Sequence, residues 1–111
     1  MSGKLRDYYV YAVLLSDDVL DEPRFRDANP RYRDGMPCVY IGMTGLQPRA
    51  RLAKHKRGEL SNRFVELYGE RVIPVTEFFE KHSKMEYDAA KCVENDLAEM
   101  LRNEGYGVWQ A

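Results

Sequence analysis

The strongest constraint on the fold is a run of aromatic and β-branched residues, YYVYAVLL, at residues 8–15. Its apolar side chains follow no helical period, and runs of this composition are typical of β-strands. Side chains in a strand alternate between the two faces of the sheet, so Tyr9, Tyr11 and Val13 share one face. A second run of the same kind, CVYIGM at residues 38–43, predicts a second strand.

The segment between these two runs, residues 16–36, is polar and rich in turn residues. It has no apolar period, and it is too long for a tight hairpin turn. We therefore expect a charged excursion, without regular secondary structure, that joins the first strand to the second.

The chain after the second strand predicts two short helices and a third strand. Pro48 suits the first turn of a helix, and Gly58 is a natural end for that helix. Residues 60–68 predict another short helix, because their apolar residues recur at helical spacing. Residues 71–79 predict a strand that Pro74 confines to an edge of the sheet or marks with a bulge.

The last helix has the clearest pattern. Ser83 and Glu86 match a capping box in which Ser83 caps the N-terminus, and Gly105 ends the helix. Its apolar residues form one stripe, which consists of Ala89, Ala90, Val93, Leu97, Met100 and Leu101. An aromatic tail at residues 106–111 is expected to pack back on the core. This order of strands and helices predicts the α+β class, with an antiparallel sheet and helices against it.

Composition narrows the class of protein further. A length of 111 residues predicts a single domain over residues 1–111, and eight Tyr, four Phe and one Trp argue against intrinsic disorder. No apolar stretch approaches the length of about 20 residues that spans a membrane, and the first residues do not resemble a signal peptide. We therefore expect a cytoplasmic protein with no membrane association. Cys38 and Cys92 lack the spacing of a zinc site or a disulfide scaffold, so both are expected to be free thiols.

Charge is unevenly distributed along the chain. The net charge of −1 argues against a protein that coats nucleic acid. Between residues 24 and 57, however, only Asp27 and Asp34 oppose a set of basic residues, which consists of Arg24, Arg26, Arg31, Arg33, Arg49, Arg51, Lys54, Lys56 and Arg57. This segment predicts a face that binds a polyanion, and ordinary solvated surface is the alternative interpretation.

Arg51 and His55 are the first candidates for chemistry. They are four residues apart in a predicted helix, so their side chains project from the same face. A guanidinium can brace two phosphate oxygens while the imidazole hydrogen-bonds a further atom or a water, which suits a phosphodiester. The alternative is a solvated basic helix.

Glu94 lies at the edge of the apolar stripe of the last helix, where a carboxylate is costly unless it meets a cation. The cation could be a structural Arg or Lys, or a divalent metal such as Mg²⁺ or Mn²⁺. Tyr11 and Tyr40 bring two phenols together if the first two strands pair, and a phenol can donate to a phosphate or act as a base. Ordinary packing of strand tyrosines is the alternative. Gly42 permits close approach of a backbone or ligand, or relieves the geometry of the following turn.

These residues occur in an order that resembles the GIY-YIG nuclease domain. The family motifs correspond to Tyr9-Val10-Tyr11, Tyr40-Ile41-Gly42, Thr44, Arg51, His55 and Glu94. A subgroup pattern is also present as Thr44-Gly45-Leu46, Pro48, His55-Lys56, Gly58, Arg63-Phe64-Val65, Tyr68-Gly69, Gly105-Tyr106 and Val108-Trp109-Gln110. The resemblance covers residues 8–110 except the excursion at 16–36.

The resemblance implies a small three-stranded antiparallel sheet flanked by helices, and divalent-metal-dependent hydrolysis of DNA phosphodiesters by an endonuclease or nickase. It implies that Glu94 holds Mg²⁺ or Mn²⁺ and that Arg51 stabilises the developing charge. A deprotonated Tyr11 or Tyr40 would activate a water, and His55 would orient or assist it. The resemblance leaves open which phenol is the base.

The chain departs from the family pattern at three places. The spacing from Tyr40-Ile41-Gly42 to Arg51 is one residue longer than in the commonest pattern. Tyr9 stands where the first motif has Gly, and Tyr106 lies near the position of an Asn that often follows the metal helix, with Gln110 as the candidate substitute. Two other functions therefore stay open, a catalytically weak nucleic-acid-binding module and a protein-interaction domain. If the protein is a nuclease, a domain of this size needs targeting, which would come from the excursion, a homodimer or a partner protein. The expected nucleic-acid contacts are Arg24, Arg26, Arg31, Arg33, Gly42, Arg49, Lys54, Lys56 and Arg57.

Overall fold

The two apolar runs pair as the central strands of the sheet. The computed structural model describes residues 8–45, 47–58, 62–73 and 85–110. Strand β1 (Tyr9–Leu15) is antiparallel to β2 (Cys38–Thr44), and the register places Tyr11 opposite Gly42 and Val13 opposite Tyr40. The predicted pairing of the first two strands is therefore confirmed.

Two further strands complete the sheet on its outer edges. Strand β3 (Gly69–Ile73) is antiparallel to β1, and β4 (Gly107–Gln110) is parallel to β2, which gives the order β3-β1-β2-β4. The α+β class is confirmed. The expectation of three antiparallel strands is wrong, because the aromatic tail adds a parallel fourth strand. β3 does lie at an edge as predicted, and the part of its predicted range from residue 74 lies outside the described residues.

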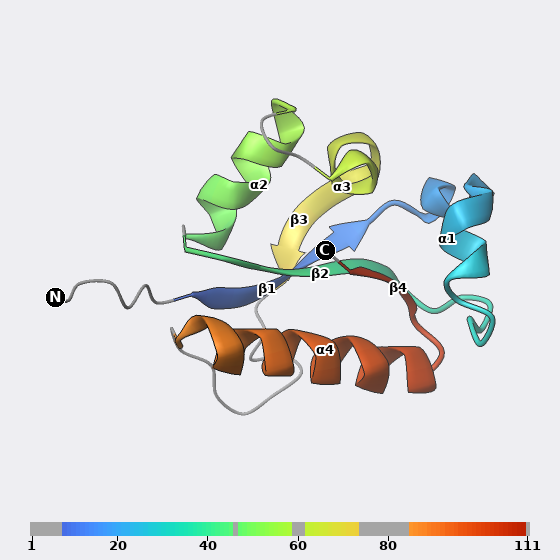
Figure 1. Ribbon diagram of the computed structural model, residues 1–111. Coiled ribbons are helices and arrows are strands. Elements are labelled where there is room, and N and C mark those ends of the chain that lie inside the picture. The colour runs from blue at the N-terminus through green and yellow to red at the C-terminus, as the bar shows by residue number, and fades with distance from the viewer. Residues whose placement is uncertain (1–7, 46, 59–61, 74–84, 111) are drawn as a thin grey trace, which may run out of the picture.

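Helices cover both faces of the sheet (Figure 1). On one face, α4 (Tyr87–Asn103) packs against alternate residues of the central strands, including Ala12 and Ile41. On the other face lie α2 (Pro48–Lys56) and α3 (Arg63–Tyr68), and there the aromatic rings of the central strands are buried. The alternation predicted for β1 therefore places Tyr11 and Tyr40 together on the α2 side.

The last helix begins later than a cap at Ser83 would place it. α4 begins at Tyr87, its N-cap is Glu86 in an extended conformation, and no side chain caps the helix. Met85 exchanges two backbone hydrogen bonds with Tyr8, of 2.7 and 2.9 Å, and this bridge keeps the chain extended up to the cap. Ser83 lies outside the described residues.

The excursion at 16–36 contains regular structure, so the expectation of an irregular segment is wrong. It forms the 3₁₀ helix η1 (Asp17–Asp21) and the short helix α1 (Pro23–Asp27). Val19 and Phe25 are completely buried, and Phe25 packs against the ring of Trp109. Two isolated apolar residues produce no period in the sequence, yet each anchors one turn of the segment to the core.

The second predicted short helix is also shorter than expected. α3 begins at Arg63, because the Asn62 side chain caps it by accepting a hydrogen bond of 2.9 Å from the backbone N–H of Phe64. The residues before Asn62, at 59–61, lie outside the described part of the chain.

Within the described residues, no helix has both the length and the apolar character needed to cross a membrane.

Asn29, in the excursion, holds β4 in place from outside the sheet. Its side-chain amide donates to the carbonyls of Val108 and Phe25, at 3.0 and 2.8 Å, and accepts from the Val108 N–H at 2.8 Å. The amide therefore replaces the neighbouring strand that the outer edge of β4 would otherwise need.

The first prediction is that Asn29→Ala lowers the free energy of unfolding by about 2 kcal/mol. The change removes the partner of the buried Val108 N–H and leaves the Val108 carbonyl only the longer hydrogen bond from Arg102 Nη2, at 3.4 Å. Urea unfolding measures this loss, and Asp27→Ala, at an exposed position of α1, is the matched control with no loss expected. Equal stability of the Asn29 variant and the wild type would show that β4 does not depend on this amide.

Candidate functional site

Tyr11 and Tyr40 form the centre of the candidate site. Their ring centroids lie 5.9 Å apart, and both residues are buried. Gly42 makes this approach feasible, since a Cβ atom at that position would lie 3.0 Å from Tyr40 Cε2 and 3.1 Å from Tyr11 Cε1. The groups that approach Gly42 are therefore the two phenol rings, which neither interpretation of this glycine had named.

His55 joins the phenols from α2. It is completely buried, so the interpretation of this helix as wholly solvated does not hold at His55. The backbone N–H of Asn62 donates to His55 Nδ1 at 3.0 Å, and His55 Nε2 lies 2.9 Å from Tyr11 Oη. Because Nδ1 accepts a hydrogen bond, the neutral imidazole carries its proton on Nε2 and donates it to Tyr11.

The hydrogen bonds then continue in one direction to Tyr40. Tyr11 Oη accepts from His55, so its own proton is directed to Tyr40, with which it shares a hydrogen bond. Burial raises the pKa of both phenols, and the bond between them raises the pKa of Tyr11 further while it lowers that of Tyr40. Tyr40 is therefore the phenol that gives up its proton more readily.

Arg51 lies one turn before His55 on α2, and its charge acts on all three groups. It lowers the pKa of Tyr11 and Tyr40, against the stronger effect of burial. Burial, followed by the charge of Arg51, lowers the pKa of His55 from 6.5 to about 4. His55 is therefore neutral at physiological pH, as the tautomer assigned above requires.

The second prediction concerns the pH dependence of stability. The pKa of His55 is lower in the folded state than in the unfolded state, so the unfolded chain binds one more proton between about pH 4 and 6.5. The stability contributed at neutral pH, about 3 kcal/mol, is lost as the pH falls through this window. Urea unfolding from pH 7 to 4 should show a steeper loss for the wild type than for His55→Gln.

Arg49→Gln, at an exposed position of the same helix, serves as the control, with a wild-type slope expected. NMR titration of the His55 ring gives the pKa directly. An ordinary pKa near 6.5, or the same pH slope in the wild type and His55→Gln, would contradict the neutral buried imidazole.

Glu94 approaches from the other side of the sheet, on α4. It is completely buried, and its Oε1 accepts hydrogen bonds from Lys91 Nζ at 2.9 Å and from Gln110 Nε2 at 3.4 Å. β4 ends at Gln110 opposite Ile41, so Glu94 lies near the place where β2 extends beyond its neighbour. Burial is the main cause of the raised pKa of both phenols, and the charge of Glu94 is a weaker cause that acts in the same direction.

The Glu94 carboxylate has one oxygen that could bind a metal. Glu94 Oε2 is buried, and within the described residues it has no hydrogen-bond partner. The described residues contain no group of three or more His, Cys, Asp or Glu side chains that could enclose a metal. A single carboxylate oxygen nevertheless fits Mg²⁺ or Mn²⁺, because Mg²⁺ is usually bound through one or two carboxylates together with waters and substrate phosphates.

Several of the predicted nucleic-acid contacts are engaged within the protein. Arg24 stacks over Trp109 at 5.9 Å, Arg26 Nε donates to a carbonyl of η1 at 2.8 Å, and Arg31 pairs with Glu99 of α4 at 3.4 Å. The side chain of Arg33 packs over the backbone of Gly105. Arg24, Arg31 and Arg33 therefore hold the excursion against the rest of the fold, whereas the Arg26 hydrogen bond joins two parts of the excursion itself.

The predicted nucleic-acid contacts on and next to α2 differ in how exposed they are. Lys56 Nζ donates to the carbonyls of Glu66 and Gly69, at 3.1 and 3.0 Å, and so holds the end of α3. Arg49 and Arg57 are exposed, and Lys54 is half-buried. Arg49 and Lys54 lie on the helix that carries Arg51 and His55, and Arg57 is its C-cap residue.

Sequence reasoning missed Lys91 and Asn62. Lys91 precedes Glu94 by three residues, a spacing that brings side chains together on a helix, and this was an available signal. Asn62 acts on His55 through its backbone N–H, which no side-chain pattern reveals.

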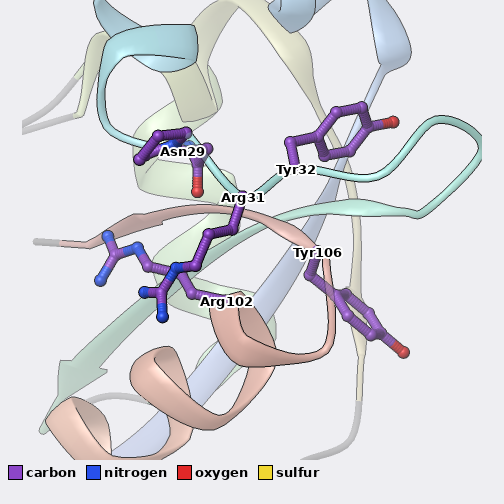
Figure 2. A pocket seen from close by; sticks show the side chains of 6 residues that line it. Asn29, Arg31, Tyr32, Arg102 and Tyr106 are labelled. Atoms are coloured by element: carbon purple, nitrogen blue, oxygen red, sulfur yellow. The ribbon is translucent and has the colours of Figure 1, made fainter.

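A shallow pocket elsewhere contains none of the predicted catalytic residues (Figure 2). It is lined by Asn29, Pro30, Arg31, Tyr32, Arg102 and Tyr106. Burial lowers the pKa of Arg102, Glu99 opposes this effect, and the charge of Arg31 adds to it. Arg31 is also paired with Glu99. None of the lining residues belongs to the candidate site, so the pocket is distinct from it.

Comparison of the chain with family models, curated proteins and solved structures gives no match. The function is therefore inferred from the geometry of the side chains described above.

Proposed function

We propose that this protein is a divalent-metal-dependent DNA endonuclease or nickase of the GIY-YIG type. The observation that carries the proposal is the directed chain of hydrogen bonds from Asn62 through His55 and Tyr11 to Tyr40, close to the charges of Arg51 and Glu94. Such a chain orients one phenol as a proton acceptor, and the cationic side chain beside it suits an anionic substrate.

Tyr40 is the base in this proposal. As a phenolate it takes a proton from a water, whose oxygen bonds to the phosphorus while the bond from phosphorus to the leaving oxygen breaks. The Tyr11 hydroxyl donates to Tyr40 and stabilises the phenolate, and His55 keeps Tyr11 in that orientation. Arg51 binds the phosphate and stabilises the negative charge that develops on it.

Glu94 is the residue that would hold the divalent cation, through Oε2. When bound, Mg²⁺ or Mn²⁺ supplies positive charge that stabilises the phosphate and the leaving oxygen. The burial of Glu94 and the lack of a partner for Oε2 within the described residues support this assignment, as does the preference of both ions for carboxylate oxygen.

The exposed cations of α2 are proposed to position the DNA backbone. Arg49 lies on the same helix as Arg51, and Arg57 is the C-cap residue of that helix, so a strand bound at Arg51 would pass near them. Contacts of this kind bind phosphates without reading the bases, and they weaken as the salt concentration rises.

Cleavage of plasmid and branched DNA tests the proposal. We expect nicking or cleavage with Mg²⁺ or Mn²⁺, and loss of activity when EDTA removes the metal. A Glu94→Gln preparation purified in the same way shows whether a contaminating nuclease is responsible. Absence of cleavage of any of these DNAs with either metal would contradict the endonuclease proposal.

The second candidate is a nucleic-acid-binding module on the same scaffold. The observation in its favour is that burial raises the pKa of both phenols, which opposes formation of the phenolate that catalysis needs. Salt-sensitive DNA binding that survives Glu94→Gln, together with no cleavage, would support this candidate over the endonuclease.

A further inference from the structure

Lys91 already supplies a cation to Glu94. Its Nζ donates to Glu94 Oε1 at 2.9 Å, and the two residues are three positions apart on α4. The two partners differ in burial, since the side chain of Glu94 has no exposed surface while that of Lys91 is 43% exposed. The carboxylate is therefore fixed inside the protein, and the ammonium lies at the end of a flexible stem that reaches solvent.

The ion pair with Lys91 uses only one of the two oxygens of the Glu94 carboxylate. Lys91 and Gln110 both approach Oε1, while Oε2 has no partner within the described residues although it is buried. A buried carboxylate is costly unless its charge is balanced and its lone pairs are used. Lys91 balances the charge of Glu94 but leaves the second oxygen available.

We propose that Lys91 is a resident counter-ion that a divalent cation must displace from Glu94, so that Lys91 sets the metal affinity of this site. This inference rests on the metal site of the proposed function and adds to it the residue that regulates occupancy. Two cations at one carboxylate repel each other, so the protein cannot keep both in place. Because the Lys91 stem is partly exposed, its ammonium moves into water at a modest cost once a metal neutralises Glu94.

The charge of Lys91 also reaches the catalytic phenol. Among the weaker influences on Tyr40, after burial and the bond from Tyr11, the charge of Lys91 lowers its pKa. The ammonium therefore lies on a part of α4 from which its charge acts on the candidate site.

Mn²⁺ binding to the full-length protein without DNA tests the inference. Lys91→Met removes the competing cation, so we expect Mn²⁺ to bind about tenfold more tightly by calorimetry or by electron paramagnetic resonance. Lys91→Arg replaces the ammonium with a guanidinium that grips a carboxylate through two hydrogen bonds, so we expect weaker Mn²⁺ binding than in the wild type. Arg63→Met, on α3, removes one positive charge away from Glu94, and we expect wild-type affinity.

Thermal unfolding supplies a second readout. Without metal, Lys91→Met should unfold at a lower temperature than the wild type, because Glu94 is left as an unpaired buried charge. Saturating Mn²⁺ should raise its unfolding temperature by more than it raises that of the wild type. If Lys91→Met does not fold without metal, the Mn²⁺ affinity of Lys91→Arg tests the inference instead, and we expect it to be weaker than that of the wild type.

Unchanged or weaker Mn²⁺ binding by Lys91→Met would overturn the inference, as would tighter binding by Lys91→Arg or the absence of Mn²⁺ binding in the wild type. These outcomes are separate from those of the DNA assay. Cleavage with unchanged Mn²⁺ affinity in the variants would remove the role of Lys91 and keep the nuclease. The expected affinity changes without any cleavage would keep the role of Lys91 and remove the nuclease.

Discussion

Tyr40→Phe is expected to lower the rate of DNA cleavage by about 10³-fold, whereas Tyr11→Phe lowers it by about tenfold. The difference follows from the direction of the hydrogen bonds. Tyr40 is the final acceptor in the chain, so its phenolate takes the proton from the attacking water. Tyr11 only donates to that phenolate, and a single such bond contributes about 1.5 kcal/mol.

Single-turnover cleavage rates, measured with saturating protein, compare the two variants without interference from product release. Both variants should bind DNA as tightly as the wild type at the same salt concentration, because neither change alters a cation. A larger loss for Tyr11→Phe than for Tyr40→Phe would assign the base to Tyr11 and reverse the proposed direction of proton transfer.

Glu94→Gln is expected to remove Mn²⁺ binding and to lower the cleavage rate by about 10³-fold or more. The amide keeps the shape of the side chain but loses the negative charge, and a bound metal contributes several kcal/mol to the stabilisation of the transition state. Calorimetry with Mn²⁺ and the single-turnover assay measure the two effects on the same preparation.

The fold of the Glu94→Gln protein should persist, because Gln can still accept a hydrogen bond from Lys91 and carries no buried charge. Asp96→Asn makes the same chemical change at an exposed position of α4, and we expect wild-type metal binding and cleavage. Metal-dependent cleavage at the wild-type rate by Glu94→Gln would show that Glu94 is a structural residue and that the metal, if needed, binds elsewhere.

The central strands and the last helix could be predicted from the sequence because their signals are local. The runs at 8–15 and 38–43 lack a helical period, and the apolar stripe of α4 repeats at helical spacing. These patterns predict which residues face the core. The position of Glu94 at the edge of that stripe also predicted a buried carboxylate that needs a cation. The structure gives it Lys91, which was one of the alternatives left open.

The remaining features depend on contacts between distant parts of the chain. β4 is too short to carry a strand signal, and it forms because Asn29 supplies the hydrogen bonds of a missing neighbour. The helices of the excursion depend on two single apolar side chains, and the basic residues there are held by Trp109 and Glu99. A count of charges in the sequence cannot separate such internal contacts from a surface that binds DNA.

The candidate site could also be predicted from the sequence only in part. The spacing of Arg51 and His55 predicted that both would project from one face of a helix, and strand pairing predicted that Tyr11 and Tyr40 would be neighbours. The direction of the hydrogen bonds was not predictable, because it is set by the backbone N–H of Asn62 at the start of another helix. That one contact fixes the tautomer of His55 and distinguishes the two phenols.

The central claim is that Tyr40, Arg51 and Glu94 act together on one phosphate, with a metal held by Glu94. Crystals grown with Mn²⁺ and a short DNA duplex test it most directly, because anomalous scattering locates the metal. We expect a peak within coordination distance of Glu94 Oε2, with Lys91 moved away from Glu94 and a DNA phosphate in contact with Arg51. A peak elsewhere, or bound DNA whose phosphates lie away from Arg51 and Tyr40, would contradict the account.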